Sequence, residues 1–244
     1  MKSSDSGDDP FYAASLMKLA LVIAVSKQID AGTIESDTVL PLTRSFISPV
    51  DGLSFAIEED SADPFFDPDL RSEARLATVM RRSITVSSNE ATNMLIDLVG
   101  FEAINAVYRA CGAINSFVER HVFDEAARVV GKTNIITAND ATAVLHAVLT
   151  GGVLTPLTSL KIKEWLLGQE QRSLIPASLP NSIVVGNKEG ETSVVRHDLA
   201  FVEVPKVGWY SLAILTHGFS TREATERIHQ TAITLHNEFV GASR

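Results

Sequence analysis

The first long hydrophobic stretch of the chain predicts a buried helix. Residues 13–31 are apolar nearly all round, and the pattern stops at Gly32. A helix without a polar face has no side to turn toward water, so we expect burial on all sides. The apolar run from Ala13 to Val25 is thirteen residues long and contains Lys18. It is too short and too polar to cross a bilayer.

The middle of the chain has the pattern of helices separated by turns. Turn-forming Pro, Gly and Asp residues crowd positions 33–68, which predicts irregular structure there. Residues 115–136 are polar and favour no single element. Thr137 is placed to cap a helix that ends at Gly151. The other helical patterns of this part cover about 70–82, 89–99, 101–110 and 156–167.

From residue 182 the period becomes that of strands. Residues 182–186, 194–204 and 209–216 are β-rich, and the last two are joined by a short turn typical of a hairpin. Ser220-Thr-Arg-Glu223 is a capping box that opens a final amphipathic helix, to about Val240. This order predicts an α+β fold, in which N- and C-terminal helices flank an antiparallel sheet and an all-helical subdomain is inserted. We expect residues 1–32 and 182–244 to form the α/β part and residues 33–181 the helical part.

Composition and charge exclude several functions. The 244 residues carry a formal net charge of −9 and no run of Lys or Arg, which argues against nucleic acid and against an anionic membrane surface as partners. The single cysteine, Cys111, forbids an internal disulfide. The first ten residues are polar and acidic, unlike a signal peptide. A cytoplasmic protein and a trimmed exported protein both remain open.

Lys18 is the strongest local anomaly in the sequence. An ammonium within Leu16-Met-Lys-Leu-Ala-Leu-Val22 is costly to bury, so it should be paired or have a lowered pKa. Ser15 lies three positions earlier, on the same face of a helix and near its positive end. A serine activated by a neutral lysine is a known nucleophile. The alternative is a surface serine beside a lysine that reaches solvent, because this spacing also occurs by chance.

Two later segments favour the catalytic interpretation. Ser87-Ser88-Asn89 follows an apolar stretch and precedes a helix, and Lys188-Glu189-Gly190 lies at the end of a predicted strand. Each is weak alone. In the order Ser-x-x-Lys, Ser-x-Asn, Lys-x-Gly, they match the three-motif plan of penicillin-recognising serine enzymes.

With these motifs the sequence resembles the class A β-lactamases and the wider group of β-lactamase-like serine hydrolases. The resemblance covers the chain from about Asp9 to the final helix. The segments that carry it are Phe11-Tyr-Ala-Ala-Ser15-Leu-Met-Lys18-Leu, Ile84-Thr-Val-Ser-Ser-Asn89, Asn134-Ile-Ile-Thr-Ala-Asn-Asp140 and Val195-Arg-His-Asp198.

The resemblance implies catalytic roles for five residues. Ser15 would be the acylated nucleophile and Lys18 its base. Ser87 would relay a proton to the departing lactam nitrogen. Asn89 would contact the substrate's side-chain amide and orient Lys18, and Lys188 would hold Ser87 and attract the substrate carboxylate.

It also implies how substrate would lie along the last motif. Gly190 would let substrate approach the strand edge, and the backbone N–H groups of Ser15 and Glu191 would form the oxyanion hole. Independently of the resemblance, the net charge of −9 means that Lys18, Lys188 and Arg196 must gather positive charge at one site if an anionic substrate binds there. The resemblance implies no cofactor and no metal ion.

Two residues depart from the family's motifs. Ser88 stands where the family usually has Asp, a mainly structural position, and its loss would loosen the loop. Glu189 replaces the usual Thr. Its carboxylate would repel an anionic β-lactam unless it points away or pairs with Lys188 or Arg196.

The Glu-x-x-Leu-Asn signature that supplies the deacylating base in this family is absent. Asp124 and Glu125 lie in the corresponding region. Either could serve as that base, and either could be a solvated loop acid.

Other motifs are weaker. Gly131-Lys132-Thr133 resembles the end of a phosphate-binding loop, but Ala126 stands where that loop needs glycine. The histidines show no metal-binding spacing. His197-Asp198 lacks the Gly-x-Ser-x-Gly turn of a serine triad enzyme.

The sequence thus predicts a serine hydrolase that opens β-lactams, or a related cyclic amide or ester, through an acyl-enzyme on Ser15. Two alternatives remain: a penicillin-binding or sensor-like relative that has lost deacylation, and a peptidase or esterase on the same fold. The expected partner is a β-lactam or a peptidoglycan-like small molecule. Only fourteen residues precede Ser15, so the sheet is expected to have an open edge, which a homodimer could cover.

Overall fold

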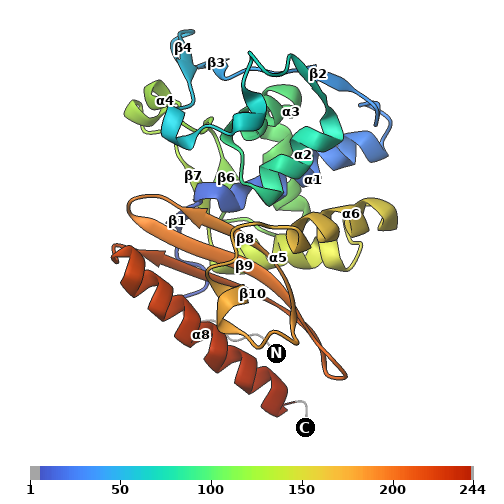
Figure 1. Ribbon diagram of the computed structural model, residues 1–244, viewed down its shortest axis with the longest axis vertical. Coiled ribbons are helices and arrows are strands. Elements are labelled where there is room, and N and C mark those ends of the chain that lie inside the picture. The colour runs from blue at the N-terminus through green and yellow to red at the C-terminus, as the bar shows by residue number, and fades with distance from the viewer. Residues whose placement is uncertain (1–5, 243–244) are drawn as a thin grey trace.

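The protein is described from a computed structural model, which describes residues 6–242. Figure 1 shows a mainly helical upper part, and below it a sheet with the last helix along its outer face. Helix α8 lies in the lower part, whereas helix α1 lies in the upper part. The fold class agrees with the prediction: helix and antiparallel sheet, with a mainly helical segment between the two ends of the chain.

The C-terminal sheet has the strand order β10-β9-β8. Its strands β8 (Val184–Glu191), β9 (Val195–Val204) and β10 (Gly208–His217) are antiparallel. Helix α8 (Thr221–Ala242) covers one face, while α5 (Ala138–Leu149) and α6 (Pro156–Leu167) contact the other. The predicted capping box forms: Ser220 N donates to Glu223 Oε2 (3.1 Å), and Glu223 N donates to Ser220 Oγ (3.3 Å).

Strand β8 runs farther than the sequence predicts. The expected strand ended at residue 186, but β8 continues through Lys188 to Glu191. Residues 185–190 are all buried, including the polar Asn187, Lys188 and Glu189. These polar groups are hydrogen-bonded inside the protein, so they can be buried in a strand. In the sequence, the same polar residues had the pattern of a loop. This extension carries the third motif.

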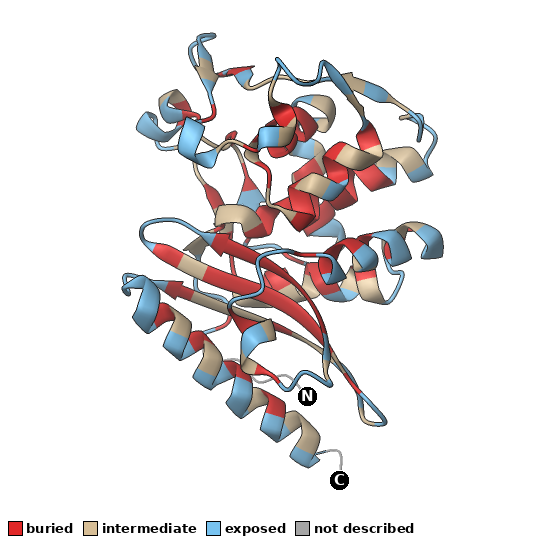
Figure 2. Cartoon of the chain, in the orientation of Figure 1, coloured by how far each residue is buried: buried red, intermediate tan, exposed pale blue. Residues whose placement is uncertain are grey.

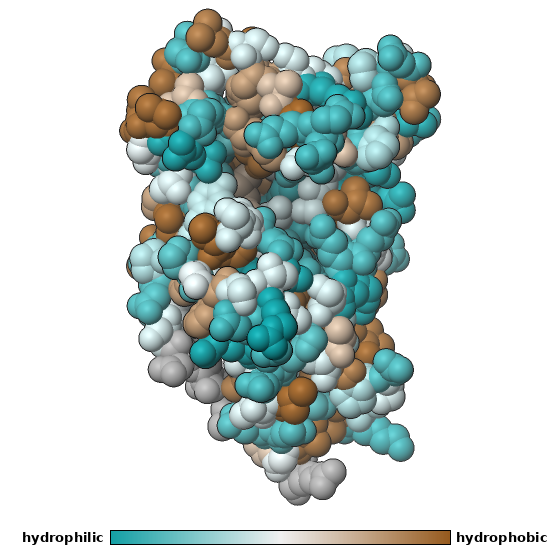
Figure 3. All heavy atoms as spheres, turned by 60° about the vertical axis from the view of Figure 1, so that its left-hand side comes forward, coloured by the Kyte–Doolittle hydropathy of each residue, from teal (hydrophilic) through white to brown (hydrophobic). Residues whose placement is uncertain are grey.

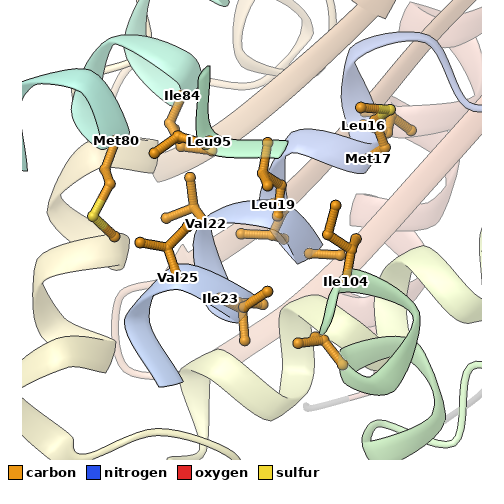
Figure 4. Close-up of a cluster of buried hydrophobic side chains, with 14 of the residues drawn as sticks. Leu16, Met17, Leu19, Val22, Ile23, Val25, Met80, Ile84, Leu95 and Ile104 are labelled. Carbon is orange, nitrogen blue, oxygen red and sulfur yellow. The ribbon is translucent and has the colours of Figure 1, made fainter. Parts of the chain in front are cut away.

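Helix α1 (Met17–Asp30) is the centre of the larger hydrophobic cluster. It follows the short 3-10 helix η1 (Ala14–Leu16), so the α-helix begins later than the expected residue 13. Every residue from Met17 to Ser26 is buried, as predicted, whereas residues 27–30 are partly or fully exposed. Figure 4 shows its side chains between those of α2 (Leu76–Thr85) and α3 (Asn89–Ala110). Each fully buried aliphatic side chain contributes about 1.5–3 kcal/mol. The apolar surface around α1 is therefore what fixes the first motif in space.

Helix α3 is two helices joined at a break, as the sequence predicts. Gly100 has φ 76°, which interrupts the helix between the expected segments 89–99 and 101–110. Helix α2, which was expected from about residue 70, begins later, at Leu76, because Glu73–Arg75 form strand β5. Thr137 caps α5 by accepting a hydrogen bond from Asp140 N, 3.1 Å away.

Short elements fill the segments that the sequence left irregular or ambiguous. Strand β2 pairs with β5, and β3 with β4. Strands of two or three residues are too short to leave a readable period. These elements are β2 (Val39–Pro41), β3 (Ser45–Ile47), β4 (Ser54–Ala56), η2 (Glu59–Ser61), η3 (Pro64–Phe66), β6 (Phe117–Val118), α4 (Glu125–Val129), β7 (Asn134–Ile136) and α7 (Ile175–Ser178).

Strand β1 (Phe11–Tyr12) ties the start of the chain to its middle. It pairs with β7 in a sheet of order β1-β7-β6, and Ala13 N donates to Asn134 O (2.8 Å). The η1 turn that follows contacts β8 and β9. Helix α1 belongs to the cluster formed with α2, α3 and α5, while α7, α8 and the outer face of the sheet form a second cluster. The division into 1–32 with 182–244 and 33–181 stays a prediction.

His197 on β9 links β1 to the C-terminal sheet. Its Nδ1 accepts a hydrogen bond from Thr216 N (3.1 Å), so its Nε2 carries the proton and donates to Tyr12 O (3.0 Å). Burial lowers the pKa of His197 to about 4. The neutral ring is required, because protonated Nδ1 would face the N–H of Thr216.

The surface is mixed in character. Buried residues concentrate in β8, β9 and the facing sides of the helices (Figure 2). Figure 3 shows hydrophobic residues scattered singly or in small groups among hydrophilic ones on the face it displays. In residues 6–242 no helix has the length and apolar character needed to span a membrane.

Leu21→Ala is expected to destabilise the protein by about 2–5 kcal/mol, because Leu21 is fully buried in α1 and its truncation leaves a cavity. Urea unfolding followed by circular dichroism measures the change. Leu157→Ala is the matched control, since Leu157 is 78% exposed and should change stability by less than about 0.5 kcal/mol. Equal effects of the two substitutions would contradict the central position of α1.

His197 is expected to make the protein less stable as pH falls from about 6.5 to about 4. The unfolded chain binds a proton at this histidine near pH 6.5, whereas the folded protein resists protonation until about pH 4, so stability decreases across that window. The free energy of unfolding of His197→Gln should depend less on pH there than that of the wild type. His146→Gln, at an exposed position, is the control. Identical pH dependence of wild type and His197→Gln would count against this role.

Candidate functional site

Ser15 lies in the tight turn before α1. Its neighbour Ala14 has φ 44°, a left-handed conformation that alanine rarely adopts, so the turn is strained. The turn lies directly against strand β8. A Cβ atom built on Gly190 would lie only 3.1 Å from Ser15 N, a tight contact, so the close approach favours glycine at this position.

The amine of Lys18 is buried and fully engaged. Its Nζ donates to Ser87 O (2.6 Å), Ser87 Oγ (3.2 Å) and Asn89 Oδ1 (2.9 Å). Burial lowers the pKa of Lys18 well below its ordinary value, repulsion from Lys188 lowers it further, and Glu90 acts in the opposite direction. Lys18 is therefore the paired, perturbed lysine that the sequence predicts, and its partners come from the second motif.

Ser87 lies at the junction of α2 and α3 in a left-handed conformation, with φ 59°. The turn is fixed on both sides, because Ser88 N donates to Arg82 O (3.1 Å) and Ser88 Oγ accepts from Ala91 N (3.2 Å) as the cap of α3. This geometry presents the Ser87 hydroxyl to two lysines at once. Strain of this kind is common at functional sites.

Lys188 reaches the same hydroxyl from β8. Its Nζ donates to Ser87 Oγ (3.0 Å) and to Glu189 O (2.7 Å). Burial lowers the pKa of Lys188 to about 7, although Glu189 and Asp198 act in the opposite direction. Both amines thus lose a proton more readily than an exposed lysine does, and one serine hydroxyl lies between them.

Glu189 does not point toward this group. Alternate residues of a strand face opposite sides, and the Glu189 carboxylate accepts hydrogen bonds from Ser173 N (2.9 Å) and Ser173 Oγ (3.5 Å). It is buried, and burial raises its pKa. Glu189 was expected to repel an anionic substrate only if its side chain faced the site. Because the side chain faces away, this repulsion does not arise.

The expected loosening at Ser88 is also offset. Ser88 Oγ donates to Glu90 Oε2 (3.2 Å), and Glu90 Oε1 accepts from Asp63 N (3.0 Å). Glu90 is completely buried. The sequence reasoning missed Glu90, although an acid directly after Ser-x-Asn at the start of a helix was visible as a signal.

The end of β8 carries the remaining residues predicted for substrate binding. Arg196 forms an ion pair with Glu191 and donates to Ser173 Oγ (3.2 Å). Thr192 N donates to Val195 O (2.9 Å) at the hairpin, and antiparallel pairs alternate, so the N–H of Glu191 points away from β9 to the free edge of β8. Gly190 borders Ser15, and Glu191 is the next residue of the same strand.

Asp124 and Glu125 have partners elsewhere. Asp124 is buried, where its Oδ2 accepts from Ser48 Oγ (3.0 Å) and its Oδ1 from Ala127 N (2.9 Å) as the cap of α4. Glu125 is exposed and pairs with Arg128, whose hydrogen bond lowers the pKa of the carboxyl. Neither acid is bound to Lys18: within residues 6–242, Lys18 Nζ forms no hydrogen bond to a carboxylate.

The other motifs carry no site. Gly131, with φ 85°, ends α4, and Lys132 N donates to Ala127 O (3.0 Å), so this segment closes a helix instead of opening one. The part of the chain that the structure describes holds no group of three His, Cys, Asp or Glu residues able to bind a metal ion.

Solved structures with this fold include β-lactamases and a penicillin-binding protein. A β-lactamase from Sphaerobacter thermophilus has a TM-score of 0.79 and 24% identity, covering 96% of this chain and 86% of that one. PBP-A, in an acyl-enzyme complex of a variant with penicillin G, has a TM-score of 0.79 and 22% identity, covering 98% and 85%. At these identities the likeness establishes the fold.

Sequence comparison identifies a related protein and a matching family. A curated β-lactamase from Rhodobacter capsulatus is 25% identical over 201 residues, which are 80% of this chain and 64% of that protein. The chain thus aligns with less than two thirds of that relative's length. Residues 4–239 match the family described as "Beta-lactamase enzyme family". Given this match over nearly the whole chain, the protein belongs to the β-lactamase enzyme family.

Proposed function

We propose that the protein is a serine hydrolase of the β-lactamase type, which opens a β-lactam or a related cyclic amide or ester through an acyl-enzyme on Ser15. The observation that carries the proposal is the Lys18–Ser87–Lys188 group, in which two buried amines with lowered pKa values meet one serine hydroxyl. Such a group can accept a proton at one end and deliver it at the other.

Acylation begins at Lys18. As a neutral amine it has two N–H donors, enough for Ser87 O and Asn89 Oδ1, and its lone pair is left to accept a proton from a hydroxyl. Ser15, one turn earlier, supplies that proton as its Oγ attacks the carbonyl carbon. The C–N bond of the lactam breaks, and the proton passes through Ser87 to the departing nitrogen.

Two backbone groups border the place where the carbonyl oxygen would develop charge. The N–H of Ser15 faces β8 at Gly190, and the N–H of Glu191 points to the free edge of that strand. We assign them as the oxyanion hole, a contribution worth about 3–4 kcal/mol in serine hydrolases.

Positive charge for an anionic substrate comes from Lys188 and Arg196. A chain of net charge −9 binds an anion only where cations gather locally. Asn89 Oδ1 holds Lys18, and its Nδ2 donates to Ser61 O (3.4 Å), which orients the amide beside the expected substrate. A β-lactam or a peptidoglycan-like amide with a carboxylate fits this arrangement.

The second candidate is a penicillin-binding relative that is acylated but deacylates slowly. The observation that favours it is the engagement of Asp124 by Ser48 and Ala127 and of Glu125 by Arg128. Hydrolysis needs a base that activates a water near the acyl-enzyme. A peptidase or esterase would use the same residues and differ only in its substrate.

The homodimer stays a prediction. Strand β10 is the edge of the sheet order β10-β9-β8 within the described residues, so a second copy could pair along it. Light scattering coupled to size exclusion measures the mass directly. A monomer at all concentrations would contradict it.

Wild-type protein incubated with a fluorescent penicillin is expected to carry one covalent adduct, and peptide mapping by mass spectrometry should place it on Ser15. Ser15→Ala should lose the adduct because it has no nucleophile. An adduct elsewhere, or none with any β-lactam, would contradict the proposed function.

Lys18→Met is expected to slow acylation by about 10²–10⁴-fold, because it removes the general base while keeping an apolar chain of similar length. Stopped-flow fluorescence measures the rate. Lys161→Met is the control, since Lys161 is exposed and lies over the Trp165 ring. An unchanged rate for Lys18→Met would contradict the role of Lys18.

Steady-state hydrolysis of a chromogenic cephalosporin separates the two candidates. A turnover rate well above that of Ser15→Ala supports the hydrolase. A stable adduct, with a burst equal to the enzyme concentration and no later turnover, supports the penicillin-binding relative.

A further inference from the structure

Glu90 is a buried carboxylate beside the catalytic group to which the proposed mechanism gives no part. It lies in the first turn of α3, immediately after Asn89, and none of its surface is exposed. A buried carboxylate is costly unless it is hydrogen-bonded and balanced by positive charge. Its surroundings therefore indicate what it does.

Its two oxygens join the motif turn to a neighbouring segment. Oε2 accepts from Ser88 Oγ (3.2 Å), and Oε1 accepts from Asp63 N (3.0 Å). The segment ending at Asp63 also holds Asn89, because Asn89 Nδ2 donates to Ser61 O (3.4 Å). Glu90 thus fixes both sides of the turn that presents Ser87 and Asn89 to Lys18.

The charged groups around it come from several elements. Arg44, before β3, places Nε 4.0 Å from Glu90 Oε1. Asp63 is itself bound by Arg82 of α2 through two hydrogen bonds (2.7 and 2.6 Å). Lys18 of α1 is attracted by the charge of Glu90 and repelled by that of Lys188 of β8. Glu90 is therefore the acid that opposes the repulsion between the two lysines at Lys18.

We propose that Glu90 is a positioning residue of the catalytic centre: it supplies the carboxylate that Ser88 lacks, fixes the Ser87–Asn89 turn to which Lys18 is hydrogen-bonded, and places a negative charge beside that turn. The inference rests on the proposed function, in which neutral Lys18 accepts the proton of Ser15. Glu90 acts through the turn and through its charge, and does not contact substrate.

The sign of the charge effect follows from electrostatics. Burial lowers the pKa of Lys18, Lys188 lowers it further, and Glu90 raises it. Removing the negative charge lowers that pKa again, so Lys18 becomes neutral at lower pH. The acylation rate rises with pH as Lys18 loses its proton, and this rising part of the pH–rate profile is its acidic limb. With a lower pKa of Lys18, the acidic limb moves to lower pH. A merely structural loss would reduce the rate at every pH without moving the limb.

The test compares two variants that separate charge from contact. Glu90→Gln keeps the shape and removes the charge, so the acidic limb of penicillin acylation should move down by about one pH unit. Ser88→Ala removes a hydrogen bond and keeps the charge, so the limb should stay in place while stability falls. A limb that does not move in Glu90→Gln overturns the proposal.

A third variant covers the case in which Glu90→Gln does not fold. Arg44→Gln removes the cation beside Glu90, so the carboxylate acts more strongly on Lys18 and the limb should move to higher pH. A limb that is unchanged or moves to lower pH overturns the charge effect.

A substrate-free measurement separates this inference from the proposed function. NMR of protein labelled at lysine ¹³Cε, with the Lys18 signal assigned by its loss in Lys18→Arg, should show a lower titration midpoint in Glu90→Gln than in the wild type. If wild-type Ser15 is not acylated, the proposed function fails, while this midpoint still decides the role of Glu90. Equal midpoints overturn it.

Discussion

The proposed chemistry depends on keeping two lysine amines out of water around one serine hydroxyl. Neither Lys18 nor Lys188 forms an ion pair with a carboxylate in the described part of the chain, and each is held by neutral oxygens of Ser87, Asn89 or the backbone. Hydrogen bonds from neutral groups satisfy the amines without restoring their ordinary proton affinity. The fold must then supply an environment dry enough to lower the pKa values and polar enough to tolerate the protonated state.

The packing of α1 meets the first requirement. Met17 to Ser26 are all buried, and only 1% of Lys18 is exposed to solvent. The second requirement is met by a turn and a strand edge from distant parts of the sequence. Gly190 lets β8 approach the Ser15 turn, and the left-handed Ser87 turns its hydroxyl toward both amines. Each of these backbone features would be unfavourable without the packing around it.

The sequence predicted what local patterns encode. The fully apolar helix, the break at Gly100, the Thr137 cap and the Ser220–Glu223 capping box follow from periodicity and capping chemistry. The three motifs also identified the residues that the structure brings together. The sequence did not predict the pairing of β1 with β7, the Glu90 contact to Asp63 or the direction of Glu189. These depend on which distant segments meet, and such contacts leave no periodic signal.

The separation of the motifs along the chain has a consequence for folding. The contacts that join Lys18 to Ser87 and Ser87 to Lys188 span 69 and 101 residues. Contacts of this separation form late, because the chain must close long loops before they bring any gain. No single helix or strand contains the whole group, and an intermediate with α1 formed but β8 undocked would leave Ser87 without Lys188. In the proposed mechanism, acylation of Ser15 would therefore report that β8 has docked, and a growing chain would not react before that strand is in place.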